Sequence, residues 1–306
     1  MSNPIKYLLI IVGPTGIGKT DLSIQLASHW ETEIISCDSR QMYREMIIGT
    51  AAPSSKQLST IPHHFVGNLS IHDYYNVSHY ETEVISLLDK LFQEKDMVIF
   101  SGGSGLYMDA VLYGMDDIPD PDPELRHRLT QRLFKEGVKK LAEELQELDP
   151  EYHREVDVNN PKRVLRGLEV WYSTGQKFSS FRIRKNSSRP FKPIMVNLEM
   201  DRKELYARIN HRVNLMIKEG LEEEARRLYP LKELNALNTV GYKEWFAHFD
   251  GQYSAEEAIR LIKRNSRHYA KRQITWNKKY HEMLNVHPSS VKEIIQWVET
   301  QKGLLG

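Results

Sequence analysis

Two patterns of apolar and polar residues, one typical of strands and one of helices, alternate along the N-terminal third of the chain. Short, continuous β-favouring runs predict buried strands at 7–12, 33–37 and 97–100, because strands covered on both faces have apolar residues throughout. Between them, apolar residues recur at helical spacing in 21–30 and 80–92, which predicts amphipathic helices. The order strand, helix, strand, helix, strand is typical of a parallel sheet with right-handed crossovers.

The pattern changes after Gly114. Three prolines and four aspartates in 116–123 are typical of a linker. Residues 124–155 have a charged helical pattern, and Pro161 begins another helix that ends at Gly175. Strand character returns at 194–198, and helices are predicted at 202–217, 221–229, 241–248 and 255–280. We therefore predict an α/β fold with a core of residues 1–114 plus 193–306 and a mainly helical insertion domain, 115–192.

The overall composition is that of an ordinary globular protein. The chain has 306 residues, of which 40% are hydrophobic and 27% charged, and these values exclude a disordered chain or a repetitive fibre. Lys and Arg number 42 against 41 Asp and Glu, a net charge of +1. A basic surface for a polyanionic partner would therefore have to be local. The single cysteine, Cys37, excludes an internal disulfide and a zinc site built from cysteine pairs, and it favours a reducing compartment.

Two further patterns concern location. No apolar run approaches the ~20 residues that a membrane helix needs. The first residues, Met1-Ser2-Asn3-Pro4, lack the charged and then apolar pattern of a signal peptide. We expect a cytoplasmic protein without membrane contact.

A phosphate-binding motif follows the first predicted strand. Gly13-Pro14-Thr15-Gly16-Ile17-Gly18-Lys19-Thr20 matches G-x-x-x-x-G-K-[ST] and precedes a predicted helix. In such a loop, backbone N–H groups and the helix N-terminus attract phosphate oxygens. Lys19 adds a positive charge, and the Thr20 hydroxyl is suited to ligate Mg²⁺. The motif predicts a P-loop NTPase-like core that binds a diphosphate or polyphosphate, and it does not identify ATP.

One acidic residue stands at the end of a predicted strand. P-loop ATPases usually have a metal-binding acid at a neighbouring strand end, but the third strand continues as Ser101-Gly102-Gly103. Asp38 follows the second strand, at the sheet edge where ligands of open α/β sheets bind. Asp38 could serve as a metal-site acid, a general base or a helix N-cap.

The last long predicted helix is locally basic. Between residues 260 and 282 there are eight Lys and Arg residues and one acid, Glu282, with Tyr269, Trp276 and Tyr280 interleaved. Basic and aromatic residues together favour an RNA-binding face. A solvated basic helix would have the same composition.

These motifs, taken in order, resemble those of the tRNA dimethylallyltransferases, which prenylate the adenosine just 3′ of the anticodon. The resemblance extends over nearly the whole chain. Besides the phosphate loop, it rests on Asp38 to Tyr43, Ile48-Gly49-Thr50-Ala51, Pro62-His63-His64, Gly102-Gly103-Ser104-Gly105-Leu106-Tyr107, Asn160-Pro161-Lys162-Arg163-Val164-Leu165-Arg166, Val240-Gly241-Tyr242-Lys243-Glu244 and Tyr269-Ala270-Lys271-Arg272-Gln273-Ile274-Thr275-Trp276.

The resemblance implies a role for each matched position. Residues 13–20 would hold dimethylallyl diphosphate with Mg²⁺ on Thr20, and Lys19 and Arg212 would assist the diphosphate. Asp38 would take a proton from the adenine N6 amine. The implied tRNA contacts are Asp38, Ser39, Arg40, Gln41, Ser104, Arg126, Lys162, Arg163, Val164, Leu165, Arg166, Lys271 and Arg272. The implied partner is the anticodon stem-loop of tRNA, bound by a monomer.

The chain departs from the family pattern at two positions. Ala52 stands where a lysine is common, and Gly67 where an acid is common. The zinc finger of eukaryotic relatives is not expected, because there is one cysteine, and this favours the bacterial form. Two other functions fit the phosphate loop: a small-molecule or nucleotide kinase, and an RNA-binding NTPase switch. The first would need an acid at the end of the third strand and an arginine lid, and the second would need a nucleotide-sensing segment. We identify none of these.

Overall fold

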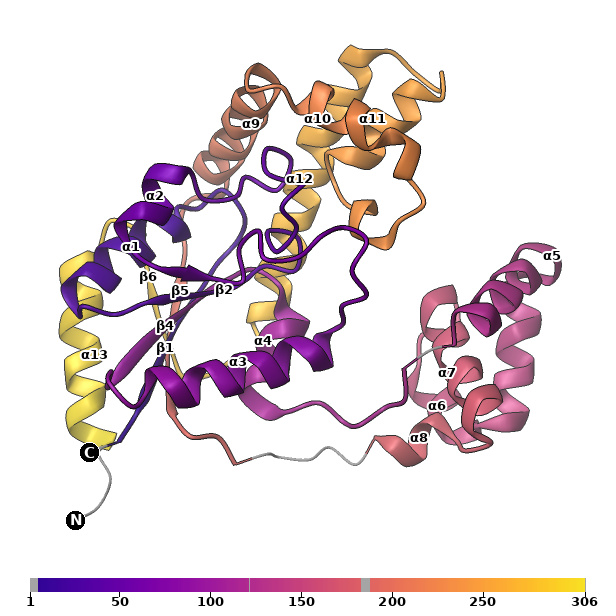
Figure 1. Ribbon diagram of the computed structural model, residues 1–306, viewed down its shortest axis with the longest axis horizontal. Helices are drawn as coiled ribbons and strands as arrows, with labels where there is room; N and C mark the ends of the chain where they lie inside the picture. The colour runs from indigo at the N-terminus through magenta and orange to yellow at the C-terminus, as the bar shows by residue number, and fades with distance from the viewer. Residues whose placement is uncertain (1–4, 121, 183–187, 306) are drawn as a thin grey trace. The chain divides into compact units, whose positions relative to one another are not determined.

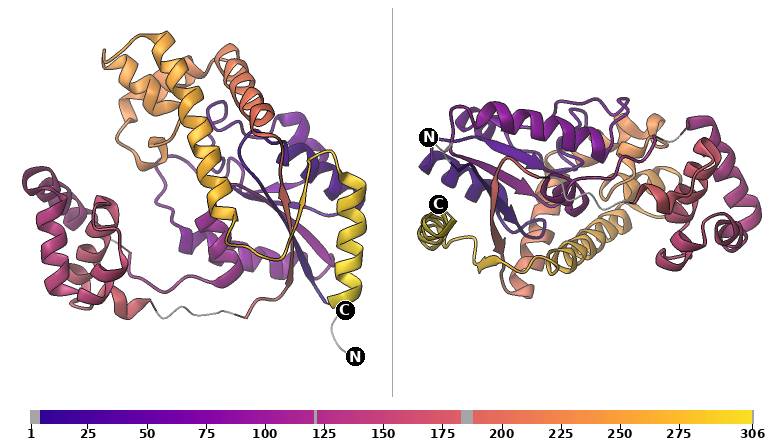
Figure 2. Two further views of the ribbon diagram at one scale, coloured as in Figure 1. Left: turned by 180° about the vertical axis from the view of Figure 1, so that it is seen from behind. Right: turned by 90° about the horizontal axis from the view of Figure 1, so that it is seen from below.

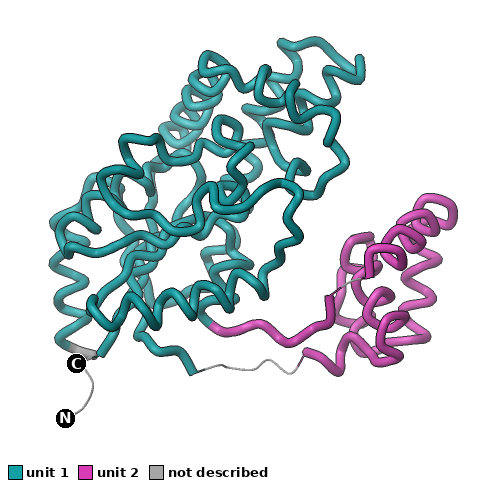
Figure 3. The backbone as a smooth tube through the Cα atoms, in the orientation of Figure 1, with its two compact units in different colours: residues 1–112, 188–306 teal, residues 113–187 magenta. Residues whose placement is uncertain are grey.

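The computed structural model describes residues 5–120, 122–182 and 188–305 (Figure 1). The chain divides into two compact units, one of residues 1–112 with 188–306 and the other of residues 113–187 (Figure 3). Residues 1–4, which carry the expectation about a signal peptide, lie outside the described residues. Within the described ranges, no helix has the length and apolar character to cross a membrane.

A six-stranded parallel sheet forms the first unit, and it confirms the predicted α/β fold. Its order is β3-β2-β4-β1-β5-β6, so β1 pairs with β4 on one side and β5 on the other. The strands are β1 Tyr7–Val12, β2 Ile34–Cys37, β3 His63–His64, β4 Met97–Gly102, β5 Lys192–Leu198 and β6 Met283–Val286. The phosphate-loop strand is therefore central and buried along its whole length.

One expectation about this sheet was wrong. The sequence pattern after residue 202 predicts only helices, yet β6 adds a sixth strand beside β5. Its four residues, Met283-Leu284-Asn285-Val286, contain one polar position and only one buried side chain, too little to show a strand pattern. The two-residue strand β3 was likewise too short to predict.

Helices cover both faces of the sheet. Leu9 and Ile11 of β1 face a cluster that includes Leu22 of α1 and Val298 of α13. Leu8 and Ile10 face the opposite cluster, which includes residues of α3 and α4, because successive strand residues point to opposite faces. The right-hand view of Figure 2 shows the sheet between these layers. The bounds are α1 Lys19–His29, α2 Ser55–Thr60, α3 Val77–Leu91, α4 Gly105–Tyr113 and α13 Val291–Leu305.

A helical layer stands beyond the carboxyl ends of the strands. It packs around Tyr242, Trp245 and Phe246 in a separate apolar cluster. Its elements are α9 Arg202–Lys218, α10 Leu221–Leu228, the 3₁₀ turns η1 Tyr229–Leu231 and η2 Asn235–Leu237, α11 Tyr242–Phe249 and α12 Ala255–Asn277. This layer brings α9 and α12 over the phosphate loop.

The second unit has its own apolar core and is helical, with α5 Pro123–Leu148, α6 Pro150–Glu155, α7 Pro161–Thr174 and α8 Phe178–Phe181. The helical pattern predicted over 124–155 is interrupted twice. Gly137 has non-helical angles (φ 80°, ψ 163°), and α6 begins after Asp149, whose carboxylate accepts the Tyr152 N–H (3.0 Å). The unit begins at residue 113 and ends at 187, whereas the sequence-based boundaries are 115 and 192.

Candidate functional site

The phosphate loop connects β1 to α1 and depends on glycine. Gly16 and Gly18 have φ of +80° and +109°, a left-handed conformation that side chains rarely adopt. A Cβ on Gly16 would also lie 3.0 Å from Ile209 of α9. Ile17 is fully buried in the core, so within the loop only its backbone is available to a ligand. Residues 13–20 therefore form a backbone anion cradle, anchored to the apolar core by the Ile17 side chain.

The side chain of Lys19, the first residue of α1, folds back onto the start of the phosphate loop. Its Nζ donates to the carbonyl oxygens of Gly13 (2.9 Å) and Pro14 (3.0 Å). Burial and the nearby Arg212 guanidinium lower the Lys19 pKa to about 8, although Asp38 opposes this shift. The ammonium is thus confined at the loop and held by neutral carbonyl groups.

Helix α9 delivers two arginines to the same loop. Arg208 and Arg212 are four residues apart, so they lie on one helix face. Arg208 Nε donates to the Gly16 carbonyl (3.2 Å), and Arg212 Nη1 donates to the Thr15 hydroxyl (3.1 Å). Burial lowers the Arg212 pKa, and Asp38 partly restores it. Arg208 had no signal in the motifs, but its spacing from Arg212 could have indicated it.

Asp38 caps a turn at the end of β2. Its Oδ1 accepts the N–H groups of Arg40 (2.9 Å) and Gln41 (3.4 Å). No helix follows in residues 39–50, so the helix N-cap alternative was wrong, although the side chain does cap backbone groups. In the described part of the chain, no hydrogen bond reaches Oδ2. One carboxylate oxygen thus stabilises the turn and leaves the other for chemistry.

Ser104 joins the Asp38 turn to the end of β4. Its hydroxyl accepts the Ser39 N–H (2.9 Å) and donates to the Ser39 hydroxyl (3.2 Å). Cys37 is buried beside this contact in the apolar cluster, and burial raises the pKa of its thiol.

Gln273 of α12 connects the phosphate loop to β4. Its Oε1 accepts the Thr15 N–H (2.8 Å), and its Nε2 donates to the Gly103 carbonyl (3.0 Å). The Tyr269 hydroxyl, one helical turn earlier, donates to the same carbonyl (3.5 Å), and burial raises the Tyr269 pKa. Both residues belong to the motif 269–276, but its sequence gave them no separate role.

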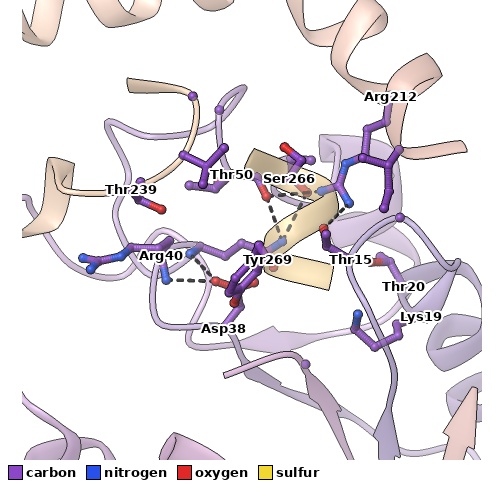
Figure 4. Close-up of a pocket in the computed structure, with 18 of the residues that line it drawn as sticks. Thr15, Lys19, Thr20, Asp38, Arg40, Thr50, Arg212, Thr239, Ser266 and Tyr269 are labelled. Atoms are coloured by element: carbon purple, nitrogen blue, oxygen red, sulfur yellow. Dashed lines mark hydrogen bonds between the residues drawn. The ribbon is translucent and has the colours of Figure 1, made fainter. Parts of the chain in front are cut away.

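Most of these groups line one cavity of about 650 Å³, whereas Gly13, Pro14, Ile17 and Ser104 are not among its wall residues. In Figure 4, Thr15, Lys19, Thr20 and Arg212 lie together, and Asp38 lies to one side of them. The other predicted residues on its wall are Gly16, Gly18, Ser39, Arg40, Gln41 and Arg272. The unpredicted ones include Thr50, Arg208, Lys243, Ser266, Tyr269 and Gln273. The cavity therefore combines a glycine-rich loop and its cations with a carboxylate.

Helix α12 has two distinct faces. Ser266, Tyr269 and Gln273 line the cavity. The opposite face exposes basic residues that include Arg264 and Lys271. Arg272 is also exposed but lies at the cavity wall, and the exposed Lys278 follows the end of the helix. Trp276 is partly exposed, with Lys279 Nζ 4.2 Å from its ring centroid.

Tyr280 differs from the expectation for this stretch. It is buried, and its hydroxyl donates to Asp109 Oδ1 (2.7 Å). Its ring therefore belongs to the core and is not available to stack on a base.

Several predicted tRNA contacts lie in the second unit. Lys162 and Arg163 are exposed at the start of α7. Val164 and Leu165 are buried, because this face of α7 packs against α5 in the apolar core. Their side chains are therefore held inside the unit, and the tRNA contact expected of residues 162–166 stays a prediction.

Two arginines of this unit are held by contacts within it. Arg126 forms a two-pronged ion pair with Glu169 (2.6 and 2.8 Å). Arg166 Nη2 donates to the Pro119 carbonyl (2.7 Å). Contacts within the protein therefore already orient both guanidinium groups in the absence of RNA.

The side chains available to a metal are few. Across the described ranges, no group of three or more His, Cys, Asp and Glu residues could hold an ion. His63 contacts the Ile61 carbonyl (2.7 Å) and His64 contacts Glu33 (2.5 Å), so both rings have hydrogen-bonding partners. The Thr20 hydroxyl and Asp38 line the cavity. These few oxygen donors fit Mg²⁺, which keeps water and substrate phosphates as its main ligands.

Comparisons with known proteins agree on one family. Residues 41–280 match the family model described as IPP transferase. The tRNA dimethylallyltransferase 1 of Phocaeicola vulgatus is 48% identical over 96% of this chain and 98% of its own length. The tRNA dimethylallyltransferase of Christiangramia forsetii is 52% identical over 91% of each chain.

Solved structures give the same answer. The tRNA isopentenylpyrophosphate transferase of Bacillus halodurans superposes with a TM-score of 0.71 at 33% identity, covering 98% of this chain and 99% of its own. A eukaryotic dimethylallyltransferase, crystallised acting on tRNA, has a TM-score of 0.76 at 26% identity, covering 94% of this chain and 75% of its own.

Proposed function

The chain belongs to the IPP transferase family, and from this premise we propose how its residues carry out the family reaction. It is a tRNA dimethylallyltransferase: it moves a dimethylallyl group from dimethylallyl diphosphate to the N6 amine of the adenosine 3′-adjacent to the anticodon, and releases diphosphate. The observation that carries the proposed residue roles is the single cavity that holds both the anion cradle and Asp38.

The cradle binds and stabilises the leaving diphosphate in this proposal. As the carbon–oxygen bond of the donor breaks, negative charge accumulates on the diphosphate oxygens. In this proposal Lys19, Arg212 and backbone N–H groups of the glycine-rich loop stabilise that charge, and fixed electrostatic groups of this kind are usually the largest source of catalysis. Arg208, which contacts the loop from the same helix face, adds to the positive field.

We assign Mg²⁺ to the same site. The Thr20 hydroxyl would hold it, and Asp38 is an acid on the same cavity wall. When bound, the cation neutralises charge on the diphosphate and so favours its departure.

Asp38 acts on the nucleophile. The lone pair of the adenine N6 amine is delocalised into the ring, which makes the amine a weak nucleophile. As the new N6–carbon bond forms, Asp38 Oδ2 accepts the proton that leaves N6, while Oδ1 stays on the turn. To reach the cavity, the adenosine must leave the anticodon-loop stack, as in other enzymes that modify a base.

Residues of both units provide the RNA contacts in this proposal. Ser39, Arg40, Gln41 and Ser104 lie next to Asp38, while Lys271 and Arg272 are on α12. Arg126, Lys162, Arg163 and Arg166 are on the second unit, and we assign them to the anticodon stem-loop. We propose that the protein acts as a monomer, in the cytoplasm where its tRNA substrate is used.

Transfer of a radiolabelled dimethylallyl group to an unmodified anticodon stem-loop tests the reaction. We expect label in the RNA only when adenosine stands 3′ to the anticodon, with a guanosine variant of the RNA as the control. Replacement of Mg²⁺ by EDTA should stop incorporation. Rapid ATP turnover without incorporation would instead favour the kinase or NTPase alternatives.

The lowered pKa of Lys19 predicts a pH-dependent affinity. Since this pKa is about 8, Lys19 is charged below pH 8 and loses its proton above it. Inorganic diphosphate binds the charged form, so its affinity should fall as the pH rises from 8 to 9.5, by up to about tenfold per unit. Calorimetric titration over this range measures the slope.

A Lys19→Arg variant provides the control for this titration. Arginine stays charged at these pH values, so its remaining slope reports the ionisation of diphosphate alone. Equal slopes for the two proteins would show that Lys19 does not titrate in this range.

A further inference from the structure

A buried carboxylate outside the cavity has an unusual set of partners. Glu224 of α10 is only 2% exposed. Its Oε2 accepts the N–H groups of Ile47 (3.1 Å) and Ile48 (2.9 Å), and its Oε1 accepts the Gly49 N–H (2.8 Å) and the Tyr242 hydroxyl (2.7 Å). No ion pair to it occurs in the ranges that the structure describes. All four of its partners are neutral donors.

Three consecutive backbone N–H groups on one carboxylate fix the path of the chain. A buried charge is costly unless its hydrogen bonds are all made, so Glu224 stabilises one conformation of residues 47–49. Tyr242 secures the other side of this loop, because a Cβ on Gly49 would lie 2.6 Å from its ring atoms. The loop is therefore clamped between a carboxylate and an aromatic ring.

The clamped loop in turn orients two residues of the cavity. The Thr50 carbonyl accepts hydrogen bonds from Arg212 Nη2 (3.4 Å) and Gln41 Nε2 (3.2 Å), and the Ala51 carbonyl accepts a second bond from Gln41 Nε2 (3.2 Å). Ala51 has φ of +46°, a strained value for a residue with a side chain. The carbonyl groups of Thr50 and Ala51 are therefore held in an orientation that an unrestrained loop would not maintain.

A continuous path of contacts therefore leads from Glu224 to the phosphate loop. It passes through the N–H groups of residues 47–49, the Thr50 carbonyl and Arg212, whose Nη1 reaches the Thr15 hydroxyl. We infer that Glu224 is a positioning residue for the transfer reaction: by clamping residues 47–51 it directs Arg212 at the diphosphate. This inference rests on the proposed diphosphate site.

A double-mutant cycle with inorganic diphosphate as the probe tests the inference. Glu224→Gln keeps the volume but turns an N–H₂ group toward N–H donors. It should raise the diphosphate Kd about tenfold, as expected when an oriented charged hydrogen bond is lost. Arg212→Ala should raise it at least as much, and the double variant should bind no more weakly than Arg212→Ala. Affinity for the anticodon stem-loop should stay within about threefold.

The outcome of the cycle separates a positioning role from a structural one. Independent effects that multiply in the double variant would overturn the inference, and so would unchanged diphosphate binding in Glu224→Gln. If the wild-type protein itself fails to bind diphosphate, the result contradicts the proposed diphosphate site and not the role of Glu224.

If Glu224→Gln does not fold, a second variant can perturb residues 47–51 from the side that faces Tyr242. Gly49→Ala leaves the carboxylate intact but forces the loop away from the Tyr242 ring. It should also weaken diphosphate binding, and the effect should again vanish in the Arg212→Ala background. Gly303→Ala, where a Cβ meets nothing within 4 Å, is the control. Wild-type binding in Gly49→Ala would contradict the inference.

Discussion

Asp38→Asn is expected to lower the rate of dimethylallyl transfer by about 10²–10⁴-fold, the usual contribution of a general base. The amide cannot take the N6 proton, but its oxygen can still accept the N–H groups of Arg40 and Gln41. The turn that carries Ser39, Arg40 and Gln41 should therefore persist. Single-turnover kinetics with labelled donor would give the rate, and a binding titration with the anticodon stem-loop should show an affinity within a few-fold of wild type.

Two further variants interpret this result. Asp38→Ala removes the turn cap as well as the base, so it should weaken RNA binding more than Asp38→Asn does. Asp73→Asn is a matched control, because Asp73 also caps an exposed turn, through the Ser70 N–H (2.7 Å), but stands outside the cavity wall. A wild-type rate in Asp38→Asn would remove Asp38 as the base.

Lys19→Met should lower kcat/KM for dimethylallyl diphosphate by about 10²–10³-fold, as removal of one fixed donor to a developing anion does elsewhere. The charge lost is the one confined between the Gly13 and Pro14 carbonyl groups. Methionine fills a similar volume without that charge. Steady-state kinetics at varied donor concentration would measure the loss.

Lys56→Met is the control for Lys19→Met, because Lys56 of α2 is exposed. It should leave kcat/KM within about twofold of the wild-type value. A tRNA affinity that falls as steeply as kcat/KM in Lys19→Met would instead indicate general misfolding. Circular dichroism and the thermal midpoint would distinguish that case.

The parts of the site that could be predicted have local signals. The phosphate loop is a contiguous motif between a strand and a helix, and its positive φ values at Gly16 and Gly18 follow from the glycines themselves. Asp38 was identifiable because parallel strands end at one edge of the sheet. Arg212 was accessible only through the family resemblance, since nothing local separates it from other arginines of its helix.

The parts that could not be predicted depend on contacts between distant segments. Gln273 touches Thr15 and Gly103 only after α12 packs over the sheet. Glu224 belongs to a run of three glutamates that reads as surface acid, and the structure buries it. The burial of Val164 and Leu165 required knowledge of which face of α7 meets α5.

The same distinction explains the accuracy of the fold. Long apolar runs and amphipathic helices have enough residues to show their period, and the central strands and most helices fall where they were expected. β3 and β6 are two and four residues long, too short for any period. The break at Gly137 could have been suspected from the glycine, but the helical pattern continues on both sides of it.

The sheet order has a consequence for how the chain folds. Leu9 in β1 pairs with Ile99 in β4 and with Ile194 in β5, and the whole second unit is synthesised between those two partners. That unit has local contacts and its own core, so it can fold while β1 still lacks one neighbour. Pairings between distant segments are slow to form because the intervening chain must first be closed into a loop. On the ribosome, we therefore expect the insertion to fold before the domain that contains it, and the cavity to be among the last features of the molecule to form.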